Sequence, residues 1–152
     1  RGPLWGQLKQ GLDVEFEGEL LKSHDYLTFK HKPRKVVIAG DNDQPDLLFE
    51  ACAGAQVLVH EATYTEEMAQ KAGEVGHSYA KLVAAFAESV QLPNLVLTHF
   101  SPRYQINPHA SPSIEDIRKE AHRVYSGSLY LARDFAEYTL DKAGHFSEVA
   151  GE

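Results

Sequence analysis

The fold is decided by residues 36–61, VVIAGDNDQPDLLFEACAGAQVLVHE, in which two short apolar runs flank a helical segment. Residues 36–39 and 57–60 are rich in β-branched side chains, and a strand that is apolar on both faces belongs inside a sheet that is covered on both sides. Between them, residues 45–53 carry apolar side chains on one helical face. This order of strand, helix and strand predicts an α/β fold.

The same alternation continues on both sides of this stretch. Further helices are expected over residues 65–72, 78–90 and 113–124, and further strands over residues 12–17, 26–30, 95–98 and 129–132. Ser78 is the expected N-cap of the strongest helix, and the Gly-rich residues 1–12 are expected to form a loop or an arm. We expect residues 1–152 to belong to one domain of the α/β (α+β) class, with helices packed on one face of its sheet.

The composition is that of a globular chain with negative charge. Its 152 residues include 15 Lys and Arg against 22 Asp and Glu, which gives a formal net charge of −7. No apolar run approaches the roughly 18 residues of a membrane span, so no membrane partner is expected. The single cysteine, Cys52, excludes an internal disulfide framework and fits a reducing, cytoplasmic compartment. Negative charge disfavours nucleic-acid binding unless Lys and Arg cluster locally, and the densest basic run is 30–35.

Side chains that can bind metals stand where the apolar runs end. Asp41 follows the first run, His60 and Glu61 end the second, and His99 follows the next one. His77 comes directly before the strongest helix. Because the carboxyl ends of the strands in an α/β sheet lie where binding sites form, these imidazoles and carboxylates are expected to converge. Asp and His are the usual oxygen and nitrogen ligands of zinc.

Each of these residues also has a purely structural interpretation. Asp41 suits a turn or a helix cap, His60 a hydrogen-bonded core histidine, and Glu61 a charge that complements a helix dipole. His99 has fewer such explanations, because it directly follows a buried strand. A metal site is therefore favoured by the whole set rather than by any single residue.

Four motifs resemble those of the ribonuclease Z family, the tRNA 3′-end processing endonucleases of the metallo-β-lactamase fold. They are Gly40-Asp41, His60-Glu61-Ala62-Thr63, His77-Ser78 and LTHFSPRY at residues 97–104. The spacing, 36 residues from Asp41 to His77 and 22 more to His99, matches the family pattern. Residues 2–9, GPLWGQLK, also resemble the segment near the base of the family's substrate arm.

The resemblance implies two divalent metal ions, expected as Zn²⁺, although the Asp and His ligands also suit manganese and iron. Asp41 would bridge the two ions, and His99 would ligate one of them. His77 and Glu61 would form a hydrogen-bonded pair that transfers a proton to the leaving oxygen. From its charge and position, Arg103 is expected to neutralise a phosphate of the substrate, precursor tRNA. The implied reaction is a two-metal hydrolysis that removes the 3′ trailer.

The chain departs from the family pattern at Asn42 and Tyr79, where the family usually has threonine. The H-x-H-x-D-H string that supplies most of the ligands is also absent. Because a catalytic zinc takes three protein ligands, Asp41 and His99 alone do not complete the centre. We therefore expect the C-terminal half of an αββα sandwich, inactive alone, whose apolar inner sheet face binds the N-terminal half of the same protein or exchanges with a second copy. The resemblance further implies a homodimer.

Two other functions stay open at this point. A hydrolase or phosphodiesterase with a small-molecule substrate would share the fold and suit a net charge of −7. A non-catalytic interaction domain would explain the missing ligand string, but it has no need of Asp41, His77 and His99. A strong loss of substrate affinity with added salt would favour RNA.

Overall fold

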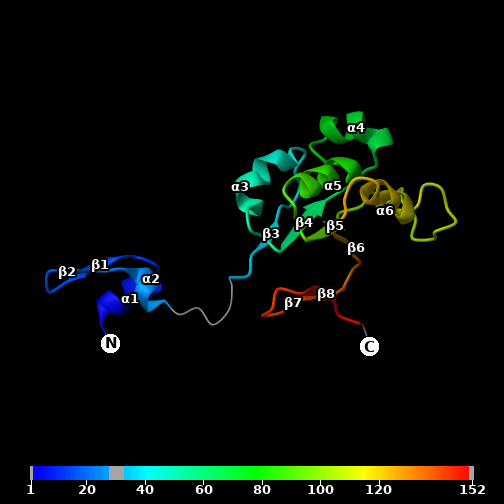
Figure 1. The fold of residues 1–152 in the computed structure, drawn as a ribbon. Helices are drawn as coiled ribbons and strands as arrows, with labels where there is room; N and C mark the ends of the chain where they lie inside the picture. The colour runs from blue at the N-terminus through cyan, green and yellow to red at the C-terminus, as the bar shows by residue number, and fades with distance from the viewer. Residues whose placement is uncertain (1, 28–32, 151–152) are drawn as a thin grey trace. The chain divides into compact units, whose positions relative to one another are not determined.

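The computed structural model describes residues 2–27 and 33–150. The chain divides into two compact units, residues 1–32 and residues 33–152, which we describe separately (Figure 1). Within the described residues, none of the helices is both long enough and apolar enough to span a bilayer.

The first unit combines two short helices with a hairpin. Its elements are α1 (Pro3–Lys9), β1 (Val14–Phe16), β2 (Glu19–Leu21) and α2 (Ser23–Tyr26). The strand expected over 12–17 is confirmed as β1, which pairs antiparallel with β2. Residues 1–12, expected as a loop or an arm, instead contain α1, because Pro3 is well suited to the first turn of a helix. The strand expected over 26–30 is wrong at Tyr26, which ends α2, and residues 28–30 lie outside the described residues.

The second unit is built on a four-stranded parallel sheet. Its strands are β3 (Val36–Ile38), β4 (Val57–Glu61), β5 (Asn94–Thr98) and β6 (Ser128–Leu131), in the order β3-β4-β5-β6. In register across three strands, Leu58 pairs with Leu95, and Leu95 with Leu129. The strands predicted over 36–39, 57–60, 95–98 and 129–132 are therefore confirmed in place.

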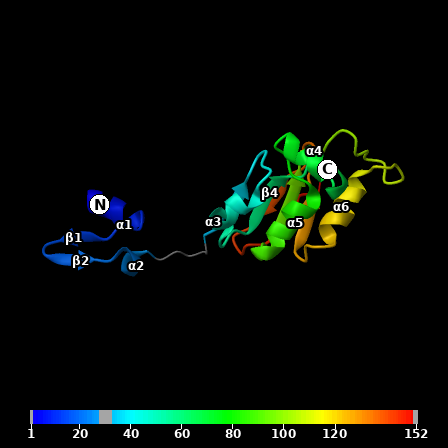
Figure 2. The same cartoon turned by 90° about the horizontal axis from the view of Figure 1, so that it is seen from above.

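Helices cover one face of this sheet (Figures 1 and 2). They are η1 (Pro45–Leu48), α3 (Phe49–Cys52), η2 (Glu66–Met68), α4 (Ala69–Glu74), α5 (Ala80–Ser89) and α6 (Ile114–His122). The core between the helices and the sheet includes Leu58, Leu95, Leu97, Val83 and Ile117, all fully buried. This agrees with the expected packing of helices on one face.

A second hairpin, β7 (Tyr138–Leu140) with β8 (Phe146–Glu148), contacts the other face of the sheet. The ring of Tyr130 in β6 lies 5.1 Å from the ring of Phe146 and 5.9 Å from the ring of Tyr138, measured between centroids. Because Leu129 and Leu131 belong to the core under the helices, Tyr130 points to the opposite face. The sequence patterns did not predict this hairpin, since each of its strands has only three residues.

Two local expectations are wrong. The first strand was expected to be buried on both faces, but Val36 is 47% exposed and Ile38 is 76% exposed. The reason is that β3 is an edge strand of the described sheet, and nothing in the described part of the chain covers Ile38. Ser78 does not cap α5, whose N-cap is Tyr79. Instead, the Ser78 hydroxyl donates a hydrogen bond to the carbonyl oxygen of Asn42, 2.7 Å away.

Candidate metal centre

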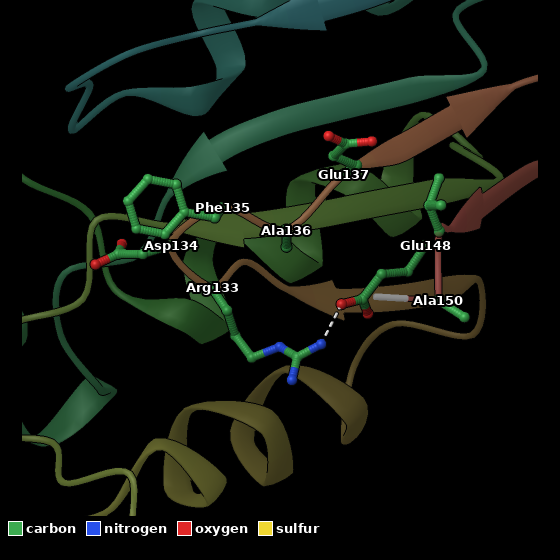
Figure 3. Close-up of a pocket in the computed structure, with 8 residues that line it drawn as sticks. Arg133, Asp134, Phe135, Ala136, Glu137, Glu148 and Ala150 are labelled. Carbon is green, nitrogen blue, oxygen red and sulfur yellow. Dashed lines mark hydrogen bonds and ion pairs between the residues drawn. The ribbon is translucent and has the colours of Figure 1, made fainter. Parts of the chain in front are cut away.

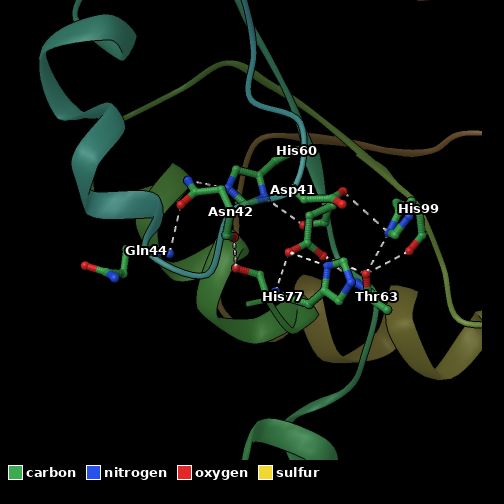
Figure 4. A network of polar contacts seen from close by, with 9 residues as sticks. Asp41, Asn42, Gln44, His60, Thr63, His77 and His99 are labelled. Atoms are coloured by element: carbon green, nitrogen blue, oxygen red, sulfur yellow. Dashed lines mark hydrogen bonds and ion pairs between the residues drawn. The ribbon is translucent and has the colours of Figure 1, made fainter. Parts of the chain in front are cut away.

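The carboxyl edge of the parallel sheet brings three metal-binding side chains together. Asp41 follows β3, His99 follows β5, and His77 lies between α4 and α5 (Figure 4). One potential ligand atom from each of these residues lies within 4.8 Å of the others. The ring centroids of His77 and His99 are 5.1 Å apart, and His99 Nδ1 is 3.8 Å from Asp41 Oδ1. The convergence predicted from the strand ends is therefore present.

The cluster is open to solvent on one side and supported by buried groups on the other. The side chains of Asp41 and His99 are 60% and 53% exposed, whereas that of His77 is only 20% exposed. Asp41 and His99 offer a carboxylate and an imidazole, donors that suit a divalent transition metal such as zinc, and His77 places a second imidazole beside them. The residues present therefore fit part of a metal centre.

Glu61 lies buried beside the cluster, and its carboxylate accepts three hydrogen bonds. Its Oε2 accepts from the backbone N–H of Thr63 at 2.9 Å and from the Thr63 hydroxyl at 2.8 Å. Its Oε1 accepts a short hydrogen bond from the backbone N–H of Ser78, the residue after His77. Glu61 thus ties the end of β4 to the loop that carries His77.

A hydrogen bond was expected between His77 and Glu61, but their side chains are too far apart for one in this structure. His77 Nδ1 lies 3.7 Å from Glu61 Oε1, a distance that allows ion pairing if the imidazole is protonated. Within the described residues, His77 Nδ1 is buried and has no hydrogen-bond partner. The two residues are neighbours, as expected, and the His77 imidazole keeps an unpaired nitrogen.

His60 is a core histidine rather than a member of the cluster. It is fully buried, and its Nδ1 lies 2.7 Å from the carbonyl oxygen of Glu61. Its Nε2 lies 3.2 Å from the side-chain nitrogen of Asn42. Because the carbonyl only accepts and the amide nitrogen only donates, Nδ1 carries the proton. Burial lowers the pKa of His60, with hydrogen bonding to Glu61 opposing the shift.

Asn42 links the two loops of the centre. Besides contacting His60, it accepts the hydroxyl proton of Ser78 at its carbonyl oxygen, and its side-chain oxygen accepts from the backbone N–H of Gln44 at 2.9 Å. This position departs from the family pattern, in which threonine is usual. The structure shows that the bonds extend to the His77 loop.

Arg103 lies beside the cluster on the exposed surface. Its Nη1 donates to the sulfur of Met68 at 3.2 Å, and its guanidinium carbon lies 5.8 Å from the centroid of the Tyr64 ring. Tyr64 in turn meets His77 edge to face, with centroids 6.4 Å apart. The ring of Tyr64 therefore contacts both Arg103 and His77.

Local clustering of Lys and Arg is described only in part, because Arg1 and residues 30–32 of the densest basic run lie outside the described residues. Lys9 belongs to the first unit and Arg103 to the second. Arg34 donates to the carbonyl oxygen of Leu140 at 2.7 Å.

A separate hollow of about 510 Å³ opens after the end of β6 (Figure 3). Arg133 and Glu148 line it and form a short ion pair. Phe135 also lines it, is fully exposed and has a φ of 64°, in the left-handed region. Because Arg133 is already paired with Glu148, it is not free to bind a charged ligand in this hollow.

Sequence reasoning found Asp41, His77 and His99, but it missed the parts played by Thr63 and Ser78. Thr63 lies two residues after the end of β4, and in the sequence it stands out only as the last residue of the His60-Glu61-Ala62-Thr63 motif. Its hydroxyl contacts both Glu61 and His99. Ser78 was interpreted as a helix cap because serine before an apolar helical run is typical of one.

The chain is similar to known proteins over nearly its whole length. No family model matches the chain. It is 52% identical to a ribonuclease Z of Pseudomonas putida strain GB-1 over 150 residues, covering 98% of this chain and 47% of the relative. It is 51% identical to a ribonuclease Z of Marinobacter nauticus over 143 residues, covering 93% of this chain and 44% of the relative. The chain thus spans about half the length of the curated relatives it matches.

A solved structure supports the fold. The metallo-β-lactamase fold protein YhfI from Bacillus subtilis superposes with a TM-score of 0.54 and 22% sequence identity, covering 75% of this chain and 39% of that one. At this level of identity the similarity concerns the fold alone. Together with the parallel sheet and its helical layer, it confirms the α/β class and the metallo-β-lactamase fold.

Proposed function

The chain is a homologue of ribonuclease Z over about half of that enzyme's length, and from this premise we propose that it forms half of an endoribonuclease active centre. The substrate is precursor tRNA, from which the complete protein removes the 3′ trailer by phosphodiester hydrolysis. The observation that carries the proposal is the cluster of Asp41, His77 and His99 at the carboxyl edge of the sheet.

Asp41 and His99 are the proposed metal ligands in this chain. Two divalent ions, with Zn²⁺ preferred, would lower the pKa of a shared water and stabilise charge on the attacking and leaving oxygens. The remaining ligands lie outside this chain, because a catalytic zinc takes three protein ligands and the H-x-H-x-D-H string is absent here. The isolated chain is therefore inactive.

His77 is the proposed proton donor to the leaving oxygen. An imidazole can donate a proton, and the position of His77 beside Asp41 and His99 brings it within reach of a phosphate bound there. Glu61 positions it, because the carboxylate holds the backbone of Ser78 and lies 3.7 Å from the imidazole. Arg103 neutralises a substrate phosphate, and its stacking on Tyr64 restricts where its guanidinium lies.

The partner half covers the sheet face opposite the helices. Ile38 is 76% exposed on that face, and Phe135 is fully exposed beyond the end of β6. Val36 lies on the same face of β3 as Ile38 and is also exposed, and adjacent exposed apolar side chains of this kind are expected at an interaction surface. The N-terminal half of the same protein supplies the second sheet of the sandwich. A homodimer and a cytoplasmic location are further parts of the proposal, drawn from the family resemblance.

Reconstitution tests the proposed function. The chain is mixed with the separately produced N-terminal half of the Pseudomonas putida relative, and cleavage of precursor tRNA is measured with Zn²⁺ or with a chelator. We expect cleavage at the 3′ trailer only when both halves and metal are present. Asp41→Asn should abolish it, whereas Asp43→Asn, a carboxylate outside the cluster, should not.

The same assay separates the other two functions. Cleavage of a chromogenic phosphodiester with no cleavage of tRNA, and little dependence on salt, would favour a small-molecule hydrolase. A folded complex that binds no metal and cleaves neither substrate would favour an interaction domain.

A further inference from the structure

Thr63 has a buried hydroxyl at the meeting point of the two strand ends that form the centre. The residue is 5% exposed. Its Oγ1 lies 2.8 Å from Glu61 Oε2, 3.0 Å from His99 Nδ1 and 3.0 Å from the carbonyl oxygen of His99. Its own carbonyl oxygen accepts from the backbone N–H of Ser101 at 3.0 Å, which holds the turn after His99 against β4.

The number of protons decides which atoms donate. The hydroxyl has one proton, and two of its neighbours, the Glu61 carboxylate and the His99 carbonyl, are acceptors only. The carboxylate is both nearer and charged, so it is the stronger acceptor. Whichever of the two takes the proton, the hydroxyl oxygen faces His99 Nδ1 with a lone pair. His99 Nδ1 must then carry a proton to complete the contact.

We infer that Thr63 is a positioning residue that holds His99 with its proton on Nδ1 and leaves Nε2 free to ligate a metal. The inference rests on the proposed function only in naming a metal as the ligand of His99. A histidine that ligates a metal commonly donates its other ring N–H to a neighbouring oxygen, which fixes the tautomer and the ring orientation. The chain of bonds from His99 through Thr63 to Glu61 provides such a support.

The closest competing acceptor does not weaken this assignment. Asp41 Oδ1 lies 3.8 Å from His99 Nδ1, too far for a hydrogen bond, whereas Thr63 Oγ1 lies 3.0 Å away.

The tautomer of His99 can be measured directly on the metal-free chain. Long-range ¹H–¹⁵N spectra separate protonated from unprotonated ring nitrogens, and spectra recorded at increasing pH identify the neutral form of the ring. We expect His99 to be protonated on Nδ1 in the wild type and in Thr63→Ser, which keeps the hydroxyl. We expect Thr63→Val, which keeps the shape and loses the hydroxyl, to shift the ring toward a mixture of tautomers.

The wild-type spectrum alone is decisive, so the test survives even if Thr63→Val fails to fold. A His99 ring protonated on Nε2 in the wild type would overturn the inference. An unchanged tautomer in a folded Thr63→Val would overturn it too.

Metal affinity gives a second readout, measured by Zn²⁺ titration of the reconstituted protein. We expect Thr63→Val to bind about 10- to 100-fold more weakly than the wild type and Thr63→Ser to bind nearly as well. Equal affinity in all three proteins would contradict the positioning role. The NMR outcome does not depend on RNA cleavage, so a failure of the proposed function would be recognised separately.

Discussion

Glu61 is a buried carboxylate whose two oxygens are surrounded by donors, so its substitution should be costly. Glutamine has one acceptor oxygen and one NH₂ group, and the NH₂ group would face the N–H of either Thr63 or Ser78. We expect Glu61→Gln to lower the free energy of unfolding by about 1–3 kcal/mol, measured by urea denaturation. Glu67→Gln, on the exposed surface of η2, is the matched control and should change it little. Equal losses in the two variants would contradict the role of Glu61.

His60 should make the stability of the chain depend on pH. Burial lowers the pKa of His60 in the folded state, so the folded chain resists protonation at this ring. The unfolded chain takes up the proton once the pH falls below about 6.5, and unfolding is then favoured. The contribution of His60 is therefore complete above that pH and is lost as the pH falls toward the lowered folded value. The group thus favours folding at neutral and higher pH.

His60→Gln tests this, because glutamine keeps a donor and an acceptor but does not titrate. Denaturation with a chelator present, at about pH 7.5 and about pH 5.5 on either side of the ordinary imidazole value, gives the free energy of unfolding. We expect the loss between the two pH values to be smaller in His60→Gln than in the wild type. An equal or larger loss would mean that the ring is not the source.

Arg103 should contribute one phosphate contact to RNA binding. We expect Arg103→Ala to bind precursor tRNA more weakly and to reduce the slope of log affinity against log salt concentration by about 1. Filter binding of precursor tRNA to the reconstituted protein at several salt concentrations measures both quantities. Arg123→Ala, on the exposed residue after α6, is the control and should leave the slope unchanged. The expectation fails if the two variants have the same slope.

The convergence of Asp41, His77 and His99 was predictable, because each follows or neighbours a recognisable apolar element. The hydrogen bonds that support them were not. A single sequence shows that Thr63 and Ser78 are polar, but their partners depend on how the loops turn. The loop after β5 turns at His99 itself, whose φ of 56° lies in the left-handed region where a non-glycine residue is uncommon.

At the scale of the elements, the apolar runs predicted the strands of the sheet, since four runs of four residues each match its four strands of three to five residues. Burial was not predictable at its edge. Val57 is fully buried, while its neighbour in register, Val36, is 47% exposed. Position in the sheet, rather than side-chain type, separates them. The hairpin β7–β8 depends on packing of Tyr138 and Phe146 with Tyr130, which no local pattern indicates.

The turn between α6 and β6 depends on a glycine. A Cβ at Gly127 would collide with the Tyr125 ring and lie 2.9 Å from the carbonyl oxygen of Leu92. That carbonyl accepts the Tyr125 hydroxyl proton at 2.8 Å. We expect Gly127→Ala to lower the thermal midpoint and to cost about 1–3 kcal/mol in the free energy of unfolding.

Gly73 provides a control of opposite sign. It lies in α4 with nothing within 4 Å of an added Cβ, so Gly73→Ala should be neutral or should stabilise by up to about 1 kcal/mol. Thermal denaturation of both variants checks the pair. A Gly127→Ala variant as stable as Gly73→Ala would show that the turn relaxes without cost.

At the scale of the whole molecule, the two faces of the sheet differ in how much of them the chain itself covers. Helices cover one face (Figure 2), whereas the hairpin leaves Ile38 exposed on the other. The single domain expected over residues 1–152 stays a prediction. The sequence also predicts that the N-terminal half covers the apolar face of this sheet, and that expectation stays a prediction too.

Ile38 should therefore matter for association and not for the fold. It is 76% exposed, so Ile38→Asp removes little buried surface from the chain, and its free energy of unfolding should change by less than about 0.5 kcal/mol. In the complex with the N-terminal half, the same change would place a charge in an apolar interface, and we expect the dissociation constant to rise at least about tenfold. Leu47 is 75% exposed and belongs to η1, among the helical elements, so Leu47→Asp is the matched control and should bind the partner half normally. Calorimetric titration of each variant with the N-terminal half measures the difference. If both variants bind as the wild type does, the partner does not occupy this face, and the exposed end of β3 requires another explanation.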